Sequence, residues 1–367
     1  MNNAFQKLIV DMGHKCKLLQ KTSISTQQNT GRNYNLDLIR SVAIILLISF
    51  HFFWKSDFYH VIITGYKCFF MIILRTVSVT CVPLFLLLTG YLMSAKKTEF
   101  SFNYYCGIFR VLGVYIISRI PILIFANRYL NQNINFLWSI VSFEQYSWYV
   151  EMYIGLFLII PFLNIIWENL KSEKQKKYLL FSLLFLTAFP SIFLYNGVTY
   201  WISIYPVTYY FLGAYLAGKE ALIIKKRKEF LILLVVCILF FSSLYFITNY
   251  NQFFIWYGWR EWGSLHNTIN AVLIFSLLQS IPHNLFFKSA FQRVIYKIAS
   301  LSYGMYLTSW IMDQIVYDKL KAFIQLQDRA YYYLPCVIIV FMGSFCLSYV
   351  LDKFYNIILK TVSFLHQ

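Results

Sequence analysis

The chain has 367 residues, of which 59% are hydrophobic, 20% aromatic and only 13% charged, and its mean hydropathy is +0.58. This composition excludes an ordinary soluble globular protein and is typical of a protein with many transmembrane helices. The formal net charge of +17 does not point to a nucleic-acid partner, because the basic residues form short runs between apolar segments, as topology signals do.

Residues 1–33 are polar and basic, with neither an apolar core nor a small-residue cleavage site. They predict a cytoplasmic N-terminal extension followed by an uncleaved first span. Residues 34–360 are predicted to form a single transmembrane domain, and residues 361–367 a short cytoplasmic tail. Since a transmembrane helix needs about 20 mostly apolar residues, we predict an all-α polytopic membrane protein with about ten transmembrane helices. The predicted spans are 35–54, 66–95, 104–126, 147–166, 178–195, 200–217, 229–249, 266–281, 298–317 and 332–358.

The basic residues between these spans are distributed unevenly over the two sides of the membrane. Nineteen Lys and Arg residues lie on the side that includes the N-terminal extension, and seven lie on the other side. Cytoplasmic loops carry the excess of Lys and Arg in membrane proteins. Both termini are therefore predicted to be cytoplasmic.

The first span, "LDLIRSVAIILLISFHFFW", contains three ionisable residues, Asp37, Arg40 and His51. A charged side chain inside a bilayer is costly, so such residues indicate a functional site. Arg40 and His51 are eleven residues apart, which is almost three helical turns, so they leave one face of the helix about 16 Å apart in depth. A histidine with an ordinary pKa of about 6.5 suits the task of accepting and returning a proton near neutral pH.

Other spans carry ionisable residues at the same two depths. Arg110 lies near the cytoplasmic end of its span, at the level of Asp37 and Arg40. Lipid does not tolerate such groups, so those at the level of His51 predict an internal polar chamber in the outer half of the membrane. Structural ion pairs between helices are the alternative explanation for them. The residues at the level of His51 are Arg75, Arg119, Glu151 and Asp313.

The seven cysteines show no CxxC or metal-ligand spacing. Those inside or beside the spans are typical of small buried hydrophobic residues. We therefore expect neither a metal site nor disulfide bonds.

An arginine near the cytoplasm and a base deeper in the membrane suit one elongated ligand. The guanidinium of Arg40 matches phosphate oxygens, and Asp37 and Arg110 lie at the same level. His51, about 16 Å further along the same face, is placed to deprotonate a hydroxyl. Acyl coenzyme A has phosphates at one end, a long thin arm and a reactive thioester at the other. The pattern therefore favours an acyl group carried from cytoplasmic acyl-CoA to an acceptor on the far side of the membrane.

Five segments resemble the acyltransferase-3 family of integral-membrane acyltransferases. The first is "RNYNLDLIRSVAIILLISFHFF", because the mark of the family is an arginine, ten residues and a histidine at the end of the first span; Arg40 and His51 fit it. Thr89 stands where the family usually has serine, Ser309 where many relatives have histidine, and Arg110 stands where many have paired arginines. The other four, in chain order, are "RTVSVTCVPLFLLLTGYLM" (75–93), "SWYVEMYIGLFLIIPFLN" (147–164), "YFLGAYLAG" (210–218) and "SYGMYLTSW" (302–310).

The resemblance implies ten transmembrane helices in a bacterial cytoplasmic membrane, and transfer of an acyl group, usually acetyl, from coenzyme A to a sugar hydroxyl of a cell-surface or lipid-linked glycan. By position, His51 would be the catalytic histidine and Arg40 its partner. His51 would act as general base on the acceptor hydroxyl, and a covalent acyl-histidine is the competing route. From depth alone, Arg75 or Arg119 would stabilise the oxyanion, and Glu151 or Asp313 would hold the other imidazole nitrogen.

Two further expectations complete the sequence analysis. Trp148, Tyr149 and the run "FFIWYGWREW" (253–262) suit stacking on a sugar, although aromatic residues at a membrane interface also serve as anchors. A transporter or flippase for a glycan or glycolipid is the alternative function, since it too needs a polar chamber. The sequence shows neither inverted repeats nor rhythmically broken spans, which would favour that alternative.

Overall fold

A computed structural model describes residues 33–96, 100–132, 134–141, 143, 146–192, 200–255, 260–282 and 289–364. The predicted N-terminal extension up to residue 32, residues 365–367 of the predicted tail and part of the aromatic run 253–262 lie outside the described residues.

The described chain is helical, and in these residues the only β pairing consists of two isolated bridges, Ile62 with Phe253 and Ile63 with Tyr250. Each of the ten predicted spans contains helix, with the second formed by two helices, α3 and α4. The α-helices are α2 (Tyr34–Lys55), α3 (Gly65–Ser78), α4 (Cys81–Met93), α5 (Phe102–Tyr129), α6 (Phe136–Val141), α7 (Trp148–Asn169), α8 (Glu173–Thr187), α9 (Tyr205–Leu216), α10 (Glu220–Lys225), α11 (Arg227–Thr248), α12 (Arg260–Gly263), α13 (Leu265–Gln279), α15 (Ser289–Phe323) and α16 (Tyr333–Phe364). The short 3₁₀ helices are η1 (Phe58–His60), η2 (Phe189–Ser191), η3 (Ile202–Ile204) and η4 (Leu326–Tyr332).

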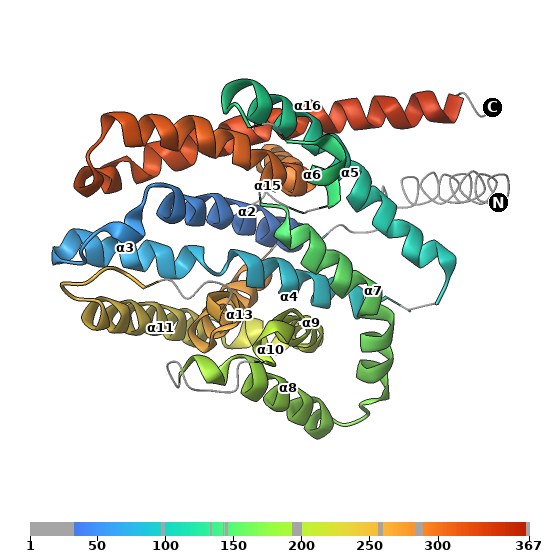
Figure 1. Cartoon of the computed structure of the whole chain (residues 1–367). Coiled ribbons are helices and arrows are strands. Elements are labelled where there is room, and N and C mark those ends of the chain that lie inside the picture. Colours follow the sequence, from blue (N-terminus) through green and yellow to red (C-terminus); the bar gives the residue numbers. More distant parts are fainter. Residues whose placement is uncertain are drawn as a thin grey trace.

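The long helices form a bundle with two ends (Figure 1). At one end, on the left in Figure 1, residues 56–64 join α2 to α3 and residues 324–332 join α15 to α16. We name this the His51 end, because α2 carries His51 toward it. At the opposite end, the Arg40 end, α2 begins and α16 ends. The first described helix therefore begins on the same side of the bundle on which the last one ends.

Six helical segments of the described chain are long and apolar enough to cross a membrane: 34–60, 65–93, 102–129, 148–169, 227–248 and 326–358. With 15, 12 and 15 residues, α8, α9 and α13 are shorter than the roughly 20 residues of a full span. α9 and α13 are largely buried among other helices, which shields them from lipid. The count of ten full spans and the cytoplasmic placement of the termini remain predictions.

The second predicted span is broken between α3 and α4, and a proline explains the break. Pro83 has no backbone N–H, so the carbonyl of Val79, four residues earlier, lacks its helical donor. The side chain of Asn267 on α13 supplies it, with Nδ2 donating to the Val79 oxygen at 3.1 Å. The break frees the beginning of α4 to line a cavity, described below.

Two glycines let α4 and α9 approach each other backbone to backbone. A Cβ added to Gly90 would lie 2.0 Å from the carbonyl oxygen of Tyr210, and one added to Gly213 would lie 2.1 Å from that of Leu87. No side chain fits at either position, so both residues must be glycine for this contact to form.

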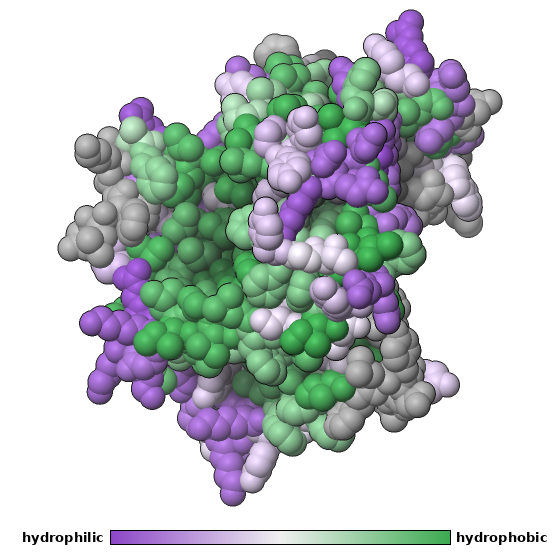
Figure 2. Space-filling view, turned by 90° about the vertical axis from the view of Figure 1, so that its left-hand side faces the viewer, coloured by the Kyte–Doolittle hydropathy of each residue, from purple (hydrophilic) through white to green (hydrophobic). Residues whose placement is uncertain are grey.

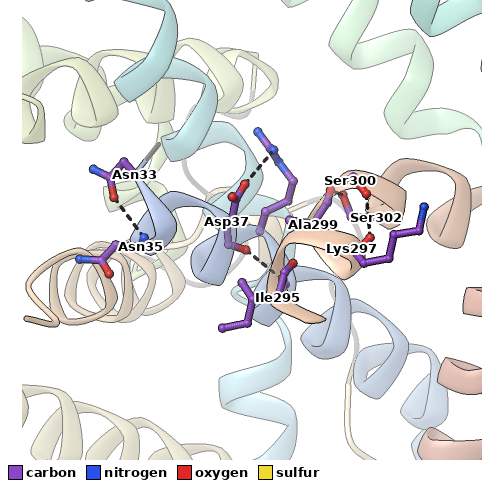
Figure 3. Close-up of polar contacts among 10 residues, drawn as sticks. Asn33, Asn35, Asp37, Ile295, Lys297, Ala299, Ser300 and Ser302 are labelled. Atoms are coloured by element: carbon purple, nitrogen blue, oxygen red, sulfur yellow. Dashed lines mark hydrogen bonds and ion pairs between the residues drawn. The ribbon is translucent and has the colours of Figure 1, made fainter. Parts of the chain in front are cut away.

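The central helix is α2, which packs against α4, α13, α15 and α16. Its beginning is fixed by side-chain hydrogen bonds: Asn35 Nδ2 donates to the carbonyls of Gln279 and Ile281 at 2.7 and 2.8 Å, and Ser41 Oγ donates to that of Ile295 at 3.1 Å. Figure 3 shows this end of α2, with Asn35 and Asp37, beside Ile295 of α15. These contacts fix the rotation of α2 and therefore the direction in which His51 points.

Candidate active site

His51 faces an acidic partner on another helix. The imidazole Nδ1 lies 2.9 Å from Oδ2 of Asp313 on α15. Asp313 is completely buried and His51 is 6% exposed. A buried carboxylate next to Nδ1 favours a proton on that nitrogen, which leaves Nε2 as the nitrogen able to accept a proton from a ligand. Of the two carboxylates proposed from the sequence for this role, the structure brings Asp313 to His51.

Tyr146, in the segment before α7, completes this pair. Its hydroxyl donates to the same Asp313 oxygen, Oδ2, at 2.9 Å, and its ring lies 4.3 Å from the His51 ring between centroids. Burial and the Asp313 charge raise the pKa of Tyr146 well above its usual value of 10, so the phenol keeps the proton it donates. The backbone of Tyr146 has φ of +72°, a left-handed conformation that costs a residue with a side chain about 1–3 kcal/mol.

A cavity of about 580 Å³ opens beside His51. It is mainly aromatic and apolar, and Trp148 and Trp262 stack at a centroid distance of 5.8 Å in its wall. Figure 2 views the molecule from the His51 end, where hydrophobic residues gather around a hollow and hydrophilic residues form a cluster to its right and groups at the lower edges. The residues that line the cavity are Leu47, Phe50, His51, Trp54, Tyr59, Cys81, Val82, Tyr146, Trp148, Tyr149, Glu151, Met152, Ser203, Tyr205, Pro206, Trp262 and Tyr306.

Two tyrosines that contact each other form part of the cavity wall. The rings of Tyr149 on α7 and Tyr306 on α15 meet edge to face at 5.9 Å between centroids, and both line the cavity. Among the described residues, Arg40 is not part of the lining. The cavity beside His51 therefore does not extend to Arg40 among the described residues.

Arg40 itself lies outside the lining of this cavity, next to Asp37. Its Nη1 is 3.9 Å from Oδ1 of Asp37, a contact marked at Asp37 in Figure 3, and its side chain is 33% exposed while that of Asp37 is 6% exposed. The guanidinium is close enough to the Tyr153 phenol of α7 to interact with it electrostatically. Arg110 is exposed on α5, and its charge acts on Tyr355 of α16 instead. Of the three residues expected to bind the coenzyme, Asp37 and Arg40 form a pair and Arg110 has different neighbours.

The two arginines expected near the oxyanion are both fully buried and lie behind the cavity wall. Arg75 Nε donates to the hydroxyl of Tyr59, which does line the cavity, at 3.1 Å, and its guanidinium lies 4.4 Å from the centre of the Phe254 ring. Arg119 Nη1 is 3.5 Å from Ser147 Oγ. Each arginine thus supports a residue or segment next to the cavity.

Glu151 and Trp148 do line the cavity, and both are exposed on α7. Glu151 is one turn from Trp148 on this helix, so a carboxylate and an indole share the cavity wall. Among the described residues, no group of three His, Cys, Asp or Glu side chains is arranged to hold a metal ion.

A family model described as an acyltransferase domain matches residues 33–352 of this chain. The chain belongs to the acyltransferase-3 family. No curated protein and no solved structure matches it. With its apolar spanning helices, this membership makes the protein an integral membrane acyltransferase.

The segments that resemble the acyltransferase-3 family serve two different purposes in this structure. Gly90 and Gly213 are the points of closest helix contact, and a Cβ added to Gly304 would meet Ser348 Oγ of α16 at 2.3 Å. Arg40 and His51 instead provide the polar groups on α2. The family pattern therefore includes glycines at close helix contacts and polar residues of the candidate site.

Sequence reasoning missed three residues of this candidate site, namely Tyr146, Ser147 and Tyr59. All three lie in short segments outside the long helices, where no periodicity shows which way a side chain points. For Trp262, the aromatic run 253–262 was a signal, and its tryptophan does reach the cavity.

Proposed function

We propose that this acyltransferase moves an acyl group, acetyl in the simplest case, from cytoplasmic acyl-CoA to a sugar hydroxyl of a cell-surface or lipid-linked glycan on the extracytoplasmic side. The observation that carries the proposal is the buried His51–Asp313 pair, with Nδ1 and Oδ2 2.9 Å apart, at the edge of a 580 Å³ cavity. A neutral imidazole oriented by a carboxylate is the usual form of a general base that activates a hydroxyl.

In the reaction we propose, His51 Nε2 takes the proton of the acceptor hydroxyl. The hydroxyl oxygen forms a bond to the thioester carbonyl carbon, and the carbon–sulfur bond then breaks. The electron pair leaves with the sulfur as the coenzyme thiolate, which takes up a proton to give free thiol. Asp313 stabilises the imidazolium that forms in between, because its carboxylate faces Nδ1.

Arg40 indicates where the acyl donor would bind. A guanidinium matches phosphate oxygens with two parallel hydrogen bonds, and Arg40 is partly exposed with Asp37 next to it. We assign the phosphates of the coenzyme to Arg40 and the thioester to the cavity. Arg40 lies outside the cavity lining, and in our proposal the contacting rings of Tyr149 and Tyr306 move apart to admit the arm of the coenzyme.

The acceptor side follows from the composition of the cavity. Stacked indoles of Trp148 and Trp262 offer flat apolar faces of the kind that pack against sugar rings, and Glu151 offers oxygens that accept hydrogen bonds from sugar hydroxyls. This combination supports a glycan as the acceptor.

The test is release of coenzyme thiol by the purified protein, given acetyl-CoA and a membrane-glycan extract. We expect the wild-type protein to release thiol, and His51→Ala to bind acetyl-CoA yet lose a factor of about 10² to 10⁴ in rate. Arg40→Ala should weaken coenzyme binding, measured by calorimetry, and Arg40→Lys should restore it only in part, since lysine lacks the bidentate fork. No thiol release by the wild-type protein, together with glycan movement across vesicles, would favour the transporter or flippase instead.

A further inference from the structure

We propose that Tyr146 is a positioning residue, which holds the Asp313 carboxylate and the His51 imidazole in the arrangement that proton transfer needs. This inference rests on the proposed function and adds to it a residue that lies outside the long helices. Tyr146 acts through His51 and Asp313, and its own hydroxyl is engaged by the carboxylate.

A single side chain contacts both members of the pair. The Tyr146 hydroxyl donates to Asp313 Oδ2 at 2.9 Å, the same oxygen that lies 2.9 Å from His51 Nδ1. The ring covers the imidazole at 4.3 Å between centroids, with 43° between the planes. One carboxylate oxygen therefore receives two contacts, and the phenol fixes the direction from which the carboxylate meets Nδ1.

The backbone conformation at Tyr146 indicates that this position needs the tyrosine side chain, because the backbone alone would favour another residue type. Tyr146 adopts φ of +72°, a region in which glycine, asparagine or aspartate is the usual residue. The next residue, Ser147, is completely buried, and its Oγ is 3.5 Å from Arg119 Nη1. A strained backbone next to a catalytic pair, held in place on its far side by a buried arginine, is typical of a functional arrangement.

The charged and titratable groups near the pair come from every element packed around it. Lys55 Nζ lies 5.5 Å from the centre of the Tyr146 ring and also feels the Asp313 charge. Glu151 lines the cavity from α7. The phenols and the thiol carry no charge at neutral pH. The surrounding groups are Lys55, Glu151, Tyr149, Tyr306, Tyr317 and Cys81.

This environment determines the direction in which the pH–rate profile should move when the Tyr146 hydroxyl is removed. Without the Tyr146 hydroxyl, the Asp313 carboxylate loses a donor and attracts a proton on the imidazole more strongly. A general base must be free of that proton before it can act. The acidic side of the pH–rate profile should therefore move to higher pH, an effect that a purely structural residue would not produce.

The experiment compares Tyr146→Phe, Tyr146→Leu and a matched control, Tyr129→Phe, which removes a hydroxyl from an exposed tyrosine at the end of α5. For Tyr146→Phe we expect kcat to fall about 10- to 100-fold, as for loss of one hydrogen bond to a charged group, with KM for acetyl-CoA unchanged and the acidic side of the profile at higher pH. Tyr146→Leu should be slower still, and Tyr129→Phe should match the wild type.

A second measurement does not depend on activity. The rate at which diethyl pyrocarbonate modifies His51, read by mass spectrometry at that residue, should rise in Tyr146→Leu, because the covering ring is gone. An equal rate of His51 modification in all variants would overturn the inference, even if the proposed reaction itself were not found. A normal pH profile and a normal kcat for Tyr146→Phe in an active enzyme would overturn it as well.

Discussion

Replacing Gly90 by alanine should separate α4 from α9. A Cβ at Gly90 would stand 2.0 Å from the Tyr210 carbonyl oxygen, which is about 1.4 Å short of the 3.4 Å at which ordinary contact begins. The opposing atom belongs to the backbone of α9, so no side-chain rotation relieves the overlap. A Cβ added to Gly213 of α9 would likewise lie 2.1 Å from the Leu87 carbonyl oxygen, so the two backbones are in close contact at two points rather than one.

The expected cost follows from this geometry. Overpacking of a core usually costs about 1–3 kcal/mol, and a clash with rigid backbone belongs at or above the top of that range. At roughly 2 °C per kcal/mol for a chain of this size, the melting temperature of Gly90→Ala in detergent should fall by about 5 °C or more. Thiol release should fall as well, since α4 contributes Cys81 and Val82 to the cavity.

Gly155→Ala is the matched control for this prediction. Gly155 lies in α7 within another segment that resembles the family, and a Cβ added there would meet nothing within 4 Å. Alanine also favours a helix by about 1 kcal/mol over glycine, so this variant should melt at or slightly above the wild-type temperature. Equal melting temperatures for the two variants, measured by fluorescence-detected size exclusion after heating, would refute the packing argument.

Two more predictions concern topology and the break in the second span. A cysteine at Gln252, exposed at the His51 end, should react in intact cells with an impermeant thiol reagent, whereas one at Lys225 should react only after lysis; the reverse pattern would invert the orientation. Asn267→Leu removes the donor to the buried Val79 carbonyl and should cost about 1–3 kcal/mol of stability. Adding Pro83→Ala restores a backbone N–H at the position that reaches this carbonyl, so the double variant should recover much of the loss in melting temperature; no recovery would contradict the account of the break.

The helices of this protein were predictable because apolar composition and length dominate the behaviour of a chain in a bilayer. The placement of His51 toward one end of α2 and Arg40 toward the other followed from helical geometry alone. The absence of Arg40 from the cavity lining did not, because the wall is built by side chains of several other helices, such as Tyr149 and Tyr306, which meet only in the folded protein.

The sequence also could not show which of the residues at the level of His51 contact one another. Depth in the membrane placed Glu151 and Asp313 at one level, and it could not say which of them reaches His51. That choice depends on the rotation of α15 about its axis and on packing against α2. Tyr146 was invisible for a different reason: its direction depends on a backbone dihedral of +72° that no pattern of residue types specifies.

The contact between Tyr149 and Tyr306 also bears on the leakage of protons through a protein of this kind. A membrane that stores energy as a proton gradient cannot contain an open aqueous pore, yet the proposed transfer, with its donor on one side and its acceptor on the other, needs some passage. In this structure the rings of Tyr149 and Tyr306 pack together in the wall of a mainly apolar cavity, and the Arg40–Asp37 pair lies outside its lining. A coenzyme arm that displaced these rings would fill the space it opened, so the substrate itself would serve as the seal during each turnover.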